Sequence, residues 1–460
     1  MKLALLSGEY PPQPGGVGDY THQLAVALRQ RGHAVAVLTI QGGRLLAYAP
    51  PPGAAPGEEE PRQILGAHTG LNWSPRCWPA VVAALDQLRP SWLHIQYQTG
   101  AYNMRPGINF LPWRLRSLPG RPMVAVTFHD LRVPYLFPKV GPLRQWVNTR
   151  LAADSDAVIA TNPSDATQLR ALSPQPSALS TQHSALSAQH SALCPAHSAL
   201  STLPGALSTQ HSALIPHPSS LSTLPGALST QHSALSTQLA LSPQLIPIGS
   251  NIPVAPPPGY TPAAWRARLG APPDTLLVAY FGLLSPSKGV DLLVEALATL
   301  RRPWRLLLVG GGASVPSDLA HAQTVRARIA ALGLAARVIE TGHAEAAAVS
   351  AHLLAADLVA LPFRDGASFR RGSLLAALAH GCVVVTTQPA DPADAALLAP
   401  AAELVPPDDP SALAAALARM AADAPARAAR AAAATTLAAH FGWATIALRH
   451  EQLYLRQSPA

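Results

Sequence analysis

Residues 276–309 read LLVAYFGLLSPSKGVDLLVEALATLRRPWRLLLV, and no other stretch of the chain indicates the fold class as clearly. The apolar run Leu276–Phe281 predicts a buried strand, and the spacing of apolar residues over Val290–Leu300 predicts a helix. Arg305–Val309 predicts a second buried strand. A helix between two strands that are apolar throughout is typical of a parallel sheet covered by helices on both faces.

The same alternation extends in both directions along the chain. Toward the C-terminus we expect strands at Arg337–Glu340, Leu358–Leu361 and Val383–Val385, and helices at Thr324–Leu332 and Leu374–Ala379. Toward the N-terminus we expect a helix at Tyr20–Gln30 and strands at Lys2–Leu6, Val35–Leu38, Trp92–Ile95, Met123–Phe128 and Ala157–Ala160. We therefore predict an α/β protein with two doubly wound, Rossmann-like domains that face a cleft. Ligands of such sheets bind beyond the carboxyl ends of the strands, so the cleft is the expected site.

The size and composition of the chain agree with two domains. Its 460 residues exceed the roughly 250–300 residues that one core supports. Hydrophobic residues make up 48% of the chain and charged residues 13%, which argues against global disorder. The net charge of +8 favours anionic partners in general. We expect no nucleic-acid partner, because no basic stripe interleaved with aromatic residues is present.

The cysteines and the apolar runs bear on the compartment. Cys77, Cys194 and Cys382 form no CxxC pair, which excludes a disulfide framework and a thiolate zinc site and suits a reducing compartment. The apolar run after Lys2 is too short for a signal peptide, and no run approaches the ~20 apolar residues that span a bilayer. We expect a cytoplasmic protein without a metal or other cofactor, and leave open a peripheral contact with the inner face of the membrane.

A low-complexity segment divides the chain. From Ala171 to Trp265 there is no Lys, Arg, Asp or Glu, and a unit close to Ser-Ala-Leu-Ser-Thr-Gln-His recurs with its leucines seven residues apart. The prolines and the single apolar pair per unit argue against a coiled coil, and the histidine spacing argues against a metal site. We predict an N-terminal domain at 1–170, completed by a C-terminal helix at 441–457. Residues 171–245 are predicted to be a surface insert without ordered structure, and 246–440 a C-terminal domain.

Four segments follow one another in a recognisable order. They are Ser7–Pro12 with Gly15–Gly18, Tyr280–Asp291, Ala356–Pro362 with Ala377–Val384, and Phe441–Tyr454. Together they resemble retaining glycosyltransferases of the GT-B fold, specifically the large family 4 group. The resemblance implies that a nucleotide-sugar donor binds in the C-terminal domain and an acceptor in the N-terminal domain. It also implies transfer of the sugar with retention of configuration and without an obligatory metal.

Candidate site residues lie at the ends of the predicted strands. Lys288 lies between a strand and a helix, where its charge can neutralise diphosphate oxygens. The glycines of Gly15–Gly18 permit close backbone approach, and a helix from about Asp19 suits phosphate at its N-terminus. The resemblance implies that His129 touches the transferred sugar, so His129 and Lys288 are the predicted catalytic residues. The predicted donor-binding residues are Gly15, Gly16, Gly18, Lys288, Asp365, Ser368, Arg370, Arg371, Gly372 and Ser373, and the predicted acceptor-binding residues are His94, Gln96 and Tyr97.

The sequence departs from the family pattern at three positions. Ser368 and Ala376 stand where the family has two glutamates that hold the donor sugar and the ribose, and Leu283 stands where it has an arginine. We expect Asp365 to contact sugar hydroxyls, and Arg370 or Arg371 to bind the diphosphate with Lys288 in place of the missing arginine. Two alternatives to a transferase stay open. One is a GT-B phosphorylase or hydrolysing epimerase, which would share the cleft but use phosphate or water. The other, which the lost glutamates favour, is a non-catalytic nucleotide-sugar-binding protein.

Overall fold

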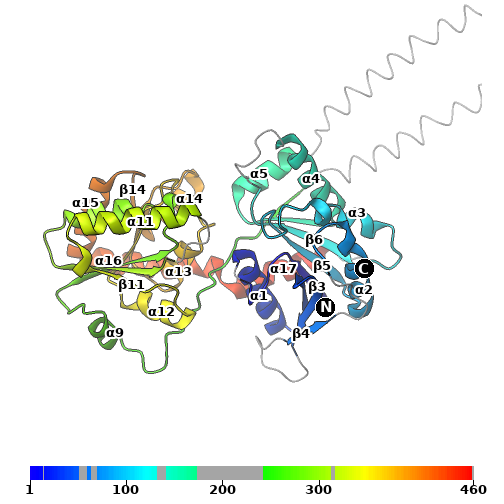
Figure 1. The fold of residues 1–460 in the computed structure, drawn as a ribbon, viewed down its shortest axis with the longest axis horizontal. Coiled ribbons are helices and arrows are strands. Elements are labelled where there is room, and N and C mark those ends of the chain that lie inside the picture. Colours follow the sequence, from blue (N-terminus) through cyan, green and yellow to red (C-terminus); the bar gives the residue numbers. More distant parts are fainter. Residues whose placement is uncertain are drawn as a thin grey trace, which may run out of the picture.

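The computed structural model describes residues 1–13, 15–50, 60–63, 70–131, 141–172, 242–311 and 316–457. Figure 1 shows two α/β domains, each with a central sheet between helices, which confirms the predicted fold class. The repeats at residues 173–241 lie outside the described residues, so the prediction for them stays untested.

The sheet of the first domain has the strand order β4-β3-β2-β1-β5-β6-β7-β8. The strands are β1 (Lys2–Ser7), β2 (Ala34–Gln41), β3 (Arg44–Ala49), β4 (Glu60–Gln63), β5 (Trp92–Tyr97), β6 (Met123–Phe128), β7 (Ala157–Ala160) and β8 (Gln244–Leu245). From β2 to β8 every neighbouring pair is parallel, whereas β3 pairs antiparallel with both β2 and β4. The strands at its centre are buried on both faces, as their continuous apolar sequence predicts.

The sheet of the second domain is parallel throughout, with the order β11-β10-β9-β12-β13-β14. Its strands are β9 (Leu276–Gly282), β10 (Trp304–Gly310), β11 (Val338–Glu340), β12 (Leu358–Leu361), β13 (Val384–Thr387) and β14 (Ala402–Val405). The strand order reverses between β9 and β12, and this switch point is where ligands of doubly wound sheets bind.

The helices cover both faces of each sheet (Figure 1). The first domain carries α1 (Gly16–Gln30), α2 (Trp78–Leu88), α3 (Leu111–Arg116), α4 (Gly141–Asp154) and α5 (Pro163–Ala171). Next along the chain come α9 (Pro262–Arg268), α10 (Val290–Ala298), α11 (Pro316–Ala331), α12 (Ala346–Ala355), α13 (Gly372–Ala379), α14 (Pro392–Leu398), α15 (Pro410–Ala422), α16 (Ala424–Ala438) and α17 (Trp443–Gln457). Several have a proline at their first or second residue after an Asp, Asn or Thr cap, a combination that satisfies free N–H groups and fixes the first turn.

The C-terminal helix α17 packs against α1 of the first domain (Figure 1). Its Ile446 and Tyr454 are fully buried and join the core formed with Leu5 and Leu24. By length and apolar composition alone, Ala424–Gln457 is long enough to cross a membrane. From the sequence we expected no membrane-spanning run. In the structure this stretch is two helices, α16 and α17, separated by a short turn at Ala439–Phe441.

Candidate active site

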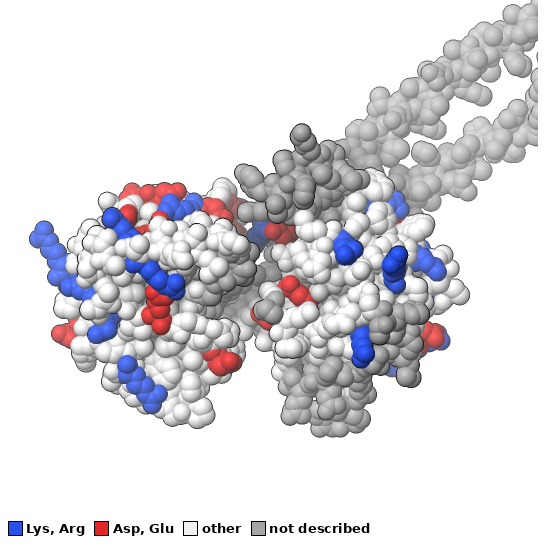
Figure 2. All heavy atoms as spheres, in the orientation of Figure 1, with Lys and Arg blue, Asp and Glu red and all other residues white. Residues whose placement is uncertain are grey.

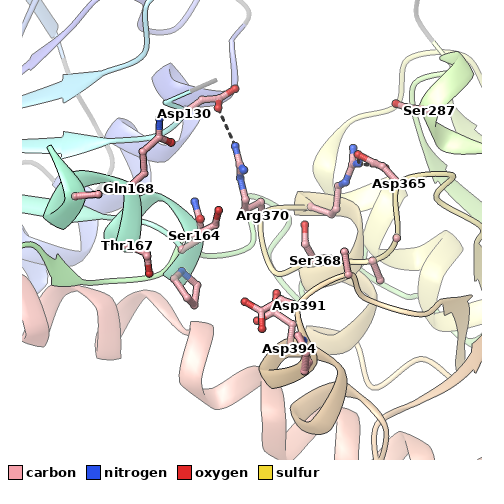
Figure 3. A pocket seen from close by; sticks show the side chains of 18 residues that line it. Asp130, Ser164, Thr167, Gln168, Ser287, Asp365, Ser368, Arg370, Asp391 and Asp394 are labelled. Carbon is pink, nitrogen blue, oxygen red and sulfur yellow. Dashed lines mark hydrogen bonds and ion pairs between the residues drawn. The ribbon is translucent and has the colours of Figure 1, made fainter. Parts of the chain in front are cut away.

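A cavity of about 1000 Å³ lies between the two domains (Figure 3). The first domain lines it with Asp130, directly after β6, and with α5, which directly follows β7. The second domain lines it with Ser287, with the loop after β12 and with the connection from β13 to α14. The lining residues are Asp130, Asn162, Pro163, Ser164, Thr167, Gln168, Ala171, Ser287, Asp365, Gly366, Ala367, Ser368, Arg370, Arg371, Ala390, Asp391, Pro392 and Asp394. The cavity thus meets the carboxyl ends of strands from both sheets, where ligands are expected.

Two glycines bring the loop after β12 close to its neighbours. Gly289 has φ +65°, and a Cβ there would lie 2.1 Å from the carbonyl oxygen of Pro362. Gly366 has φ +83°, and a Cβ there would lie 2.7 Å from the carbonyl oxygen of Gln388. No larger residue fits at either position without a shift of the backbone. The Lys-Gly pair at 288–289 therefore packs directly against the loop that bears Asp365 and Arg371.

Lys288 and Arg371 both lie close to the same aromatic ring. The ammonium nitrogen of Lys288 lies 5.1 Å from the ring centroid of buried Phe363, and the guanidinium carbon of Arg371 lies 4.9 Å from it. Arg371 also pairs with Asp365. Burial, followed by the charge of Arg371, lowers the pKa of Lys288 to about 8, and Asp365 opposes this shift. The charge of Arg371 thus disfavours the charged form of Lys288, and an anion bound near both cations would favour it.

Arg370 points away from this pair and toward the first domain. Its guanidinium donates a hydrogen bond of 3.0 Å to Asp130 (Figure 3). Of the two adjacent arginines in the predicted clamp, the structure therefore places Arg371 with Lys288 and Arg370 at the domain boundary.

The positions that depart from the family pattern differ in their surroundings. Ser368 lines the cavity, whereas Ala376 is fully buried within α13. Leu283 is 42% exposed and offers no charge. Gly372 and Ser373 form the first turn of α13 and are not among the residues that line the cavity.

At the glycine segment Gly15–Gly18, the carboxylate of Glu9 lies at the N-terminus of helix α1. The structure starts α1 at Gly16, earlier than the sequence predicts, so Gly16 and Gly18 belong to its first turn. A carboxylate oxygen of Glu9 accepts hydrogen bonds from the backbone N–H groups of Val17 at 2.9 Å and Gly18 at 3.3 Å. A Cβ at Gly15 would collide with the Glu9 carboxylate, whereas one at Gly16 would meet open space. The side of the loop at Gly16 thus stays open to a ligand.

His129 is part of a polar cluster beside the cavity. One ring nitrogen, Nε2, lies 3.0 Å from the Oε1 atom of Gln96, and the ring meets the edge of Tyr20 at 4.6 Å between centroids. Burial, with a smaller contribution from the charge of His450, lowers the pKa of His129 to about 3. His129 is therefore neutral at physiological pH. It directly precedes Asp130, which lines the cavity.

The three predicted acceptor residues lie in the interior of the first domain. His94 is buried, with Nδ1 2.6 Å from the Tyr454 hydroxyl and Nε2 2.7 Å from the Thr127 hydroxyl. The hydroxyl of buried Tyr97 donates to Asn148 at 3.1 Å, and Gln96 is fully buried beside His129. None of the three is among the residues that line the cavity.

Sequence reasoning missed two walls of the cavity. The first is α5 with Ser164, Thr167 and Gln168, and the second is the start of α14 with Asp391 and Asp394. Both directly follow predicted strands, so the rule that ligands bind at strand ends could have identified them. Within the described part of the chain, no group of three or more His, Cys, Asp or Glu side chains is arranged to hold a metal ion.

Two glycosyltransferase families match the chain. The family described as "Glycosyl transferase 4-like domain" matches residues 15–180, and "Glycosyl transferases group 1" matches residues 275–423. A D-inositol 3-phosphate glycosyltransferase of Kineococcus radiotolerans is 33% identical over 217 residues, which cover 44% of this chain and 48% of the relative. The chain thus spans about half the length of this curated relative.

Solved structures match over nearly the whole chain and show the same fold. The sucrose-phosphate synthase of Thermosynechococcus elongatus has a TM-score of 0.63 at 21% identity, covering 99% of this chain and 98% of that one. HepE of Anabaena, solved in complex with UDP, has a TM-score of 0.63 at 18% identity, covering 99% of this chain and 100% of that one. The chain therefore belongs to the glycosyltransferases, with a 4-like domain in its first half and a group 1 domain in its second half, in the GT-B arrangement.

Proposed function

We propose that this protein transfers a sugar from a nucleotide-sugar donor to an acceptor bound between the domains, with retention of configuration. The single observation that supports this most is the placement of Lys288 and Arg371 at the ring of Phe363, each about 5 Å from its centroid. Two cations at the switch point of the second sheet, one of them largely buried, complement the negative charge of a diphosphate leaving group. The bond from the anomeric carbon to the diphosphate oxygen breaks, a glycosidic bond to the acceptor oxygen forms, and the proton of the acceptor hydroxyl goes to the departing diphosphate oxygen.

The site residues have distinct roles in this proposal. Lys288 and Arg371 bind the diphosphate, and the backbone at Gly16 approaches it from the first domain. Ser368 and Asp365 contact the donor sugar, and neutral His129 lies on the side of the cavity where the transferred sugar meets the acceptor. Solved structures of HepE with UDP and with UDP-glucose support a uridine nucleotide as the first donor to test.

A panel of UDP-, GDP- and ADP-sugars in a thermal-shift assay tests the donor. A ligand at 100 times its dissociation constant stabilises the folded state by about 2.7 kcal/mol. Release of the nucleoside diphosphate with a candidate acceptor then tests transfer. If no nucleotide sugar stabilises the protein, the proposal is wrong.

A second candidate, a non-catalytic nucleotide-sugar-binding protein, has one observation in its favour. Neither Ser368 nor Ala376 supplies the carboxylate that the resemblance leads us to expect, and Ala376 is buried in the core. Donor binding without release of the nucleoside diphosphate, across acceptors and in water, would favour this candidate. Formation of a sugar phosphate in phosphate buffer would favour the phosphorylase.

A further inference from the structure

The charges that line the cavity are unevenly distributed. Four carboxylates and two guanidiniums line it. Arg370 pairs with Asp130 and Arg371 pairs with Asp365, so each guanidinium already has a carboxylate partner. Asp391 and Asp394 form no ion pair with any residue in the described part of the chain. Among the described residues, the cavity thus has one end with paired charges and one end with two carboxylates that no cation pairs with.

The acidic end is built by α14 and the loop after β12. An oxygen of Asp391 accepts the N–H of Ala393 at 2.8 Å and caps α14, and the backbone N–H of Phe369 bonds to Asp394. Burial, together with the charge of Asp391, raises the pKa of Asp394. Figure 3 shows both carboxylates away from Ser287, below the Arg370–Asp130 pair, and Figure 2 shows acidic side chains along the boundary between the domains.

The opposite wall of this end is neutral and polar. Ser164, Thr167 and Gln168 project from α5 of the first domain and line the cavity with hydroxyl and amide groups. Their side chains can both donate and accept hydrogen bonds, whereas the two carboxylates only accept. A molecule with many hydroxyl groups satisfies both walls. A molecule that carries a phosphate or carboxylate meets two uncompensated negative charges, which costs several kcal/mol when it is close to them.

We propose that the acceptor is a polyhydroxylated molecule without a phosphate or carboxylate group, a neutral polyol or an amino sugar. It binds between α5 and the Asp391–Asp394 end of the cavity, with the carboxylates accepting its hydroxyl or ammonium protons. This inference rests on the proposed function for its place in the reaction and deepens that function by naming the acceptor class.

The test compares three probes that differ in charge: glucose, glucosamine and glucose 6-phosphate. Binding to the full-length protein saturated with UDP is followed by saturation-transfer NMR. We expect glucose and glucosamine to bind, and glucose 6-phosphate to bind at least about tenfold more weakly than glucose. In the double variant Asp391→Asn with Asp394→Asn, the gap between glucose and glucose 6-phosphate should narrow to less than about threefold.

The matched control is Asp423→Asn. Asp423 caps α16 as Asp391 caps α14, through an oxygen that accepts the N–H of Ala426 at 2.8 Å, but it does not line the cavity. Asparagine caps a helix about as well as aspartate, so both variants should fold. The control should keep the full preference against glucose 6-phosphate.

Three outcomes overturn the inference: glucose 6-phosphate binds as tightly as glucose, the preference is unchanged in the double variant, or none of the three probes binds. If UDP does not bind, GDP or ADP takes its place; if none of the three nucleotides binds, the proposed function fails separately, and the probes are measured on the protein without nucleotide. A preference against the phosphorylated probe that depends on Asp391 and Asp394 would then still support the acidic subsite.

Discussion

Arg370 of the second domain donates a hydrogen bond of 3.0 Å to Asp130 of the first domain, across the cavity between them. Its neighbour Arg371 faces the other way, toward Asp365 and Phe363. Two adjacent arginines thus meet different partners, because the loop turns between them before α13 begins. The contributions of Arg370 and Arg371 to donor binding therefore need to be measured separately.

The first prediction separates the two arginines. Arg371→Ala should weaken UDP binding by about ten- to a hundredfold, because a charge-assisted hydrogen bond is worth ~1.5–3 kcal/mol. Arg370→Ala should weaken it by less than about threefold, since Arg370 extends toward Asp130 of the first domain and does not share the Phe363 ring with Lys288. Isothermal titration with UDP measures both. Arg301→Ala, an exposed position away from the cavity, is the control. Equal losses in Arg370→Ala and Arg371→Ala would show that both arginines hold the diphosphate.

The second prediction concerns the pH dependence of donor binding through Lys288. The pKa of Lys288 is lowered to about 8, so a large share of these side chains loses its charge above that pH. UDP affinity should therefore fall as the pH rises from about 7.5 to 9.5, whereas the variant Lys288→Arg should keep its affinity over this range because arginine stays charged. Stability of the free protein moves in the opposite direction. The unfolded lysine binds more protons between pH 8 and 10.5, so this group makes the folded state more stable as the pH rises through that window.

A binding curve that is flat in the parent, or one that falls equally in Lys288→Arg, would remove Lys288 from the diphosphate site. Urea unfolding of both proteins over the same pH range provides a second measurement that does not depend on the ligand.

The third prediction concerns Glu9 at the start of α1. Glu9→Ala removes the acceptor for the N–H groups of Val17 and Gly18, and should lower the free energy of unfolding by about 1–2 kcal/mol. If the donor diphosphate approaches Gly16, it competes with this carboxylate, so Glu9→Gln should tighten UDP binding several-fold. Unchanged UDP binding in Glu9→Gln, with the protein folded, would show that the donor does not reach the N-terminus of α1.

The sequence predicted most of the fold because each strand of the parallel sheets is a self-contained apolar run. Over 276–309 the observed β9, α10 and β10 agree with the prediction to within two residues at each end. The hairpin of β3 and β4 was missed, since its strands are short and lie at the edge of the sheet. The start of α1 was placed too late because three glycines in four positions resemble a loop. The contact with Glu9, which compensates for them, is made only in the folded protein.

The site was less predictable from the sequence than the fold. The loop bearing Asp365 and Arg371 was identified, because the motif before it marks the end of a strand. Which of two adjacent arginines faces Lys288 depends on loop geometry, and no pattern of residue types encodes it. Asp391 and Ser164 lie in different domains, and their approach depends on how the domains pack. His94 was expected in the acceptor pocket, but the structure places its side chain between Tyr454 and Thr127.

The last prediction concerns three buried histidines where α17 meets the first domain. His94 and His450 have ring centroids 5.4 Å apart, and the charge of His450 acts on His129. Burial is the main cause that lowers the pKa of all three: His129 to about 3, His450 to about 4, and His94 well below its usual value. Unfolded histidines titrate near 6.5, so between that pH and about 4 the unfolded chain binds more protons than the folded one. The free energy of unfolding should therefore fall as the pH drops through this window.

Each histidine that stays neutral in the folded state contributes a slope of about 1.4 kcal/mol per pH unit below the unfolded pKa. His450→Leu should therefore reduce the slope by about this amount between pH 6 and 4.5, measured by urea unfolding at several pH values. The buried Nε2 atom of His450 has no hydrogen-bond partner among the described residues, so this change should cost little stability at pH 7.5. Leu453→Ala, in the same helix, is the control that should lower stability equally at every pH. If the curves of the parent and His450→Leu run parallel, His450 takes up its proton in the folded protein, and the cluster is more open to water than its burial indicates.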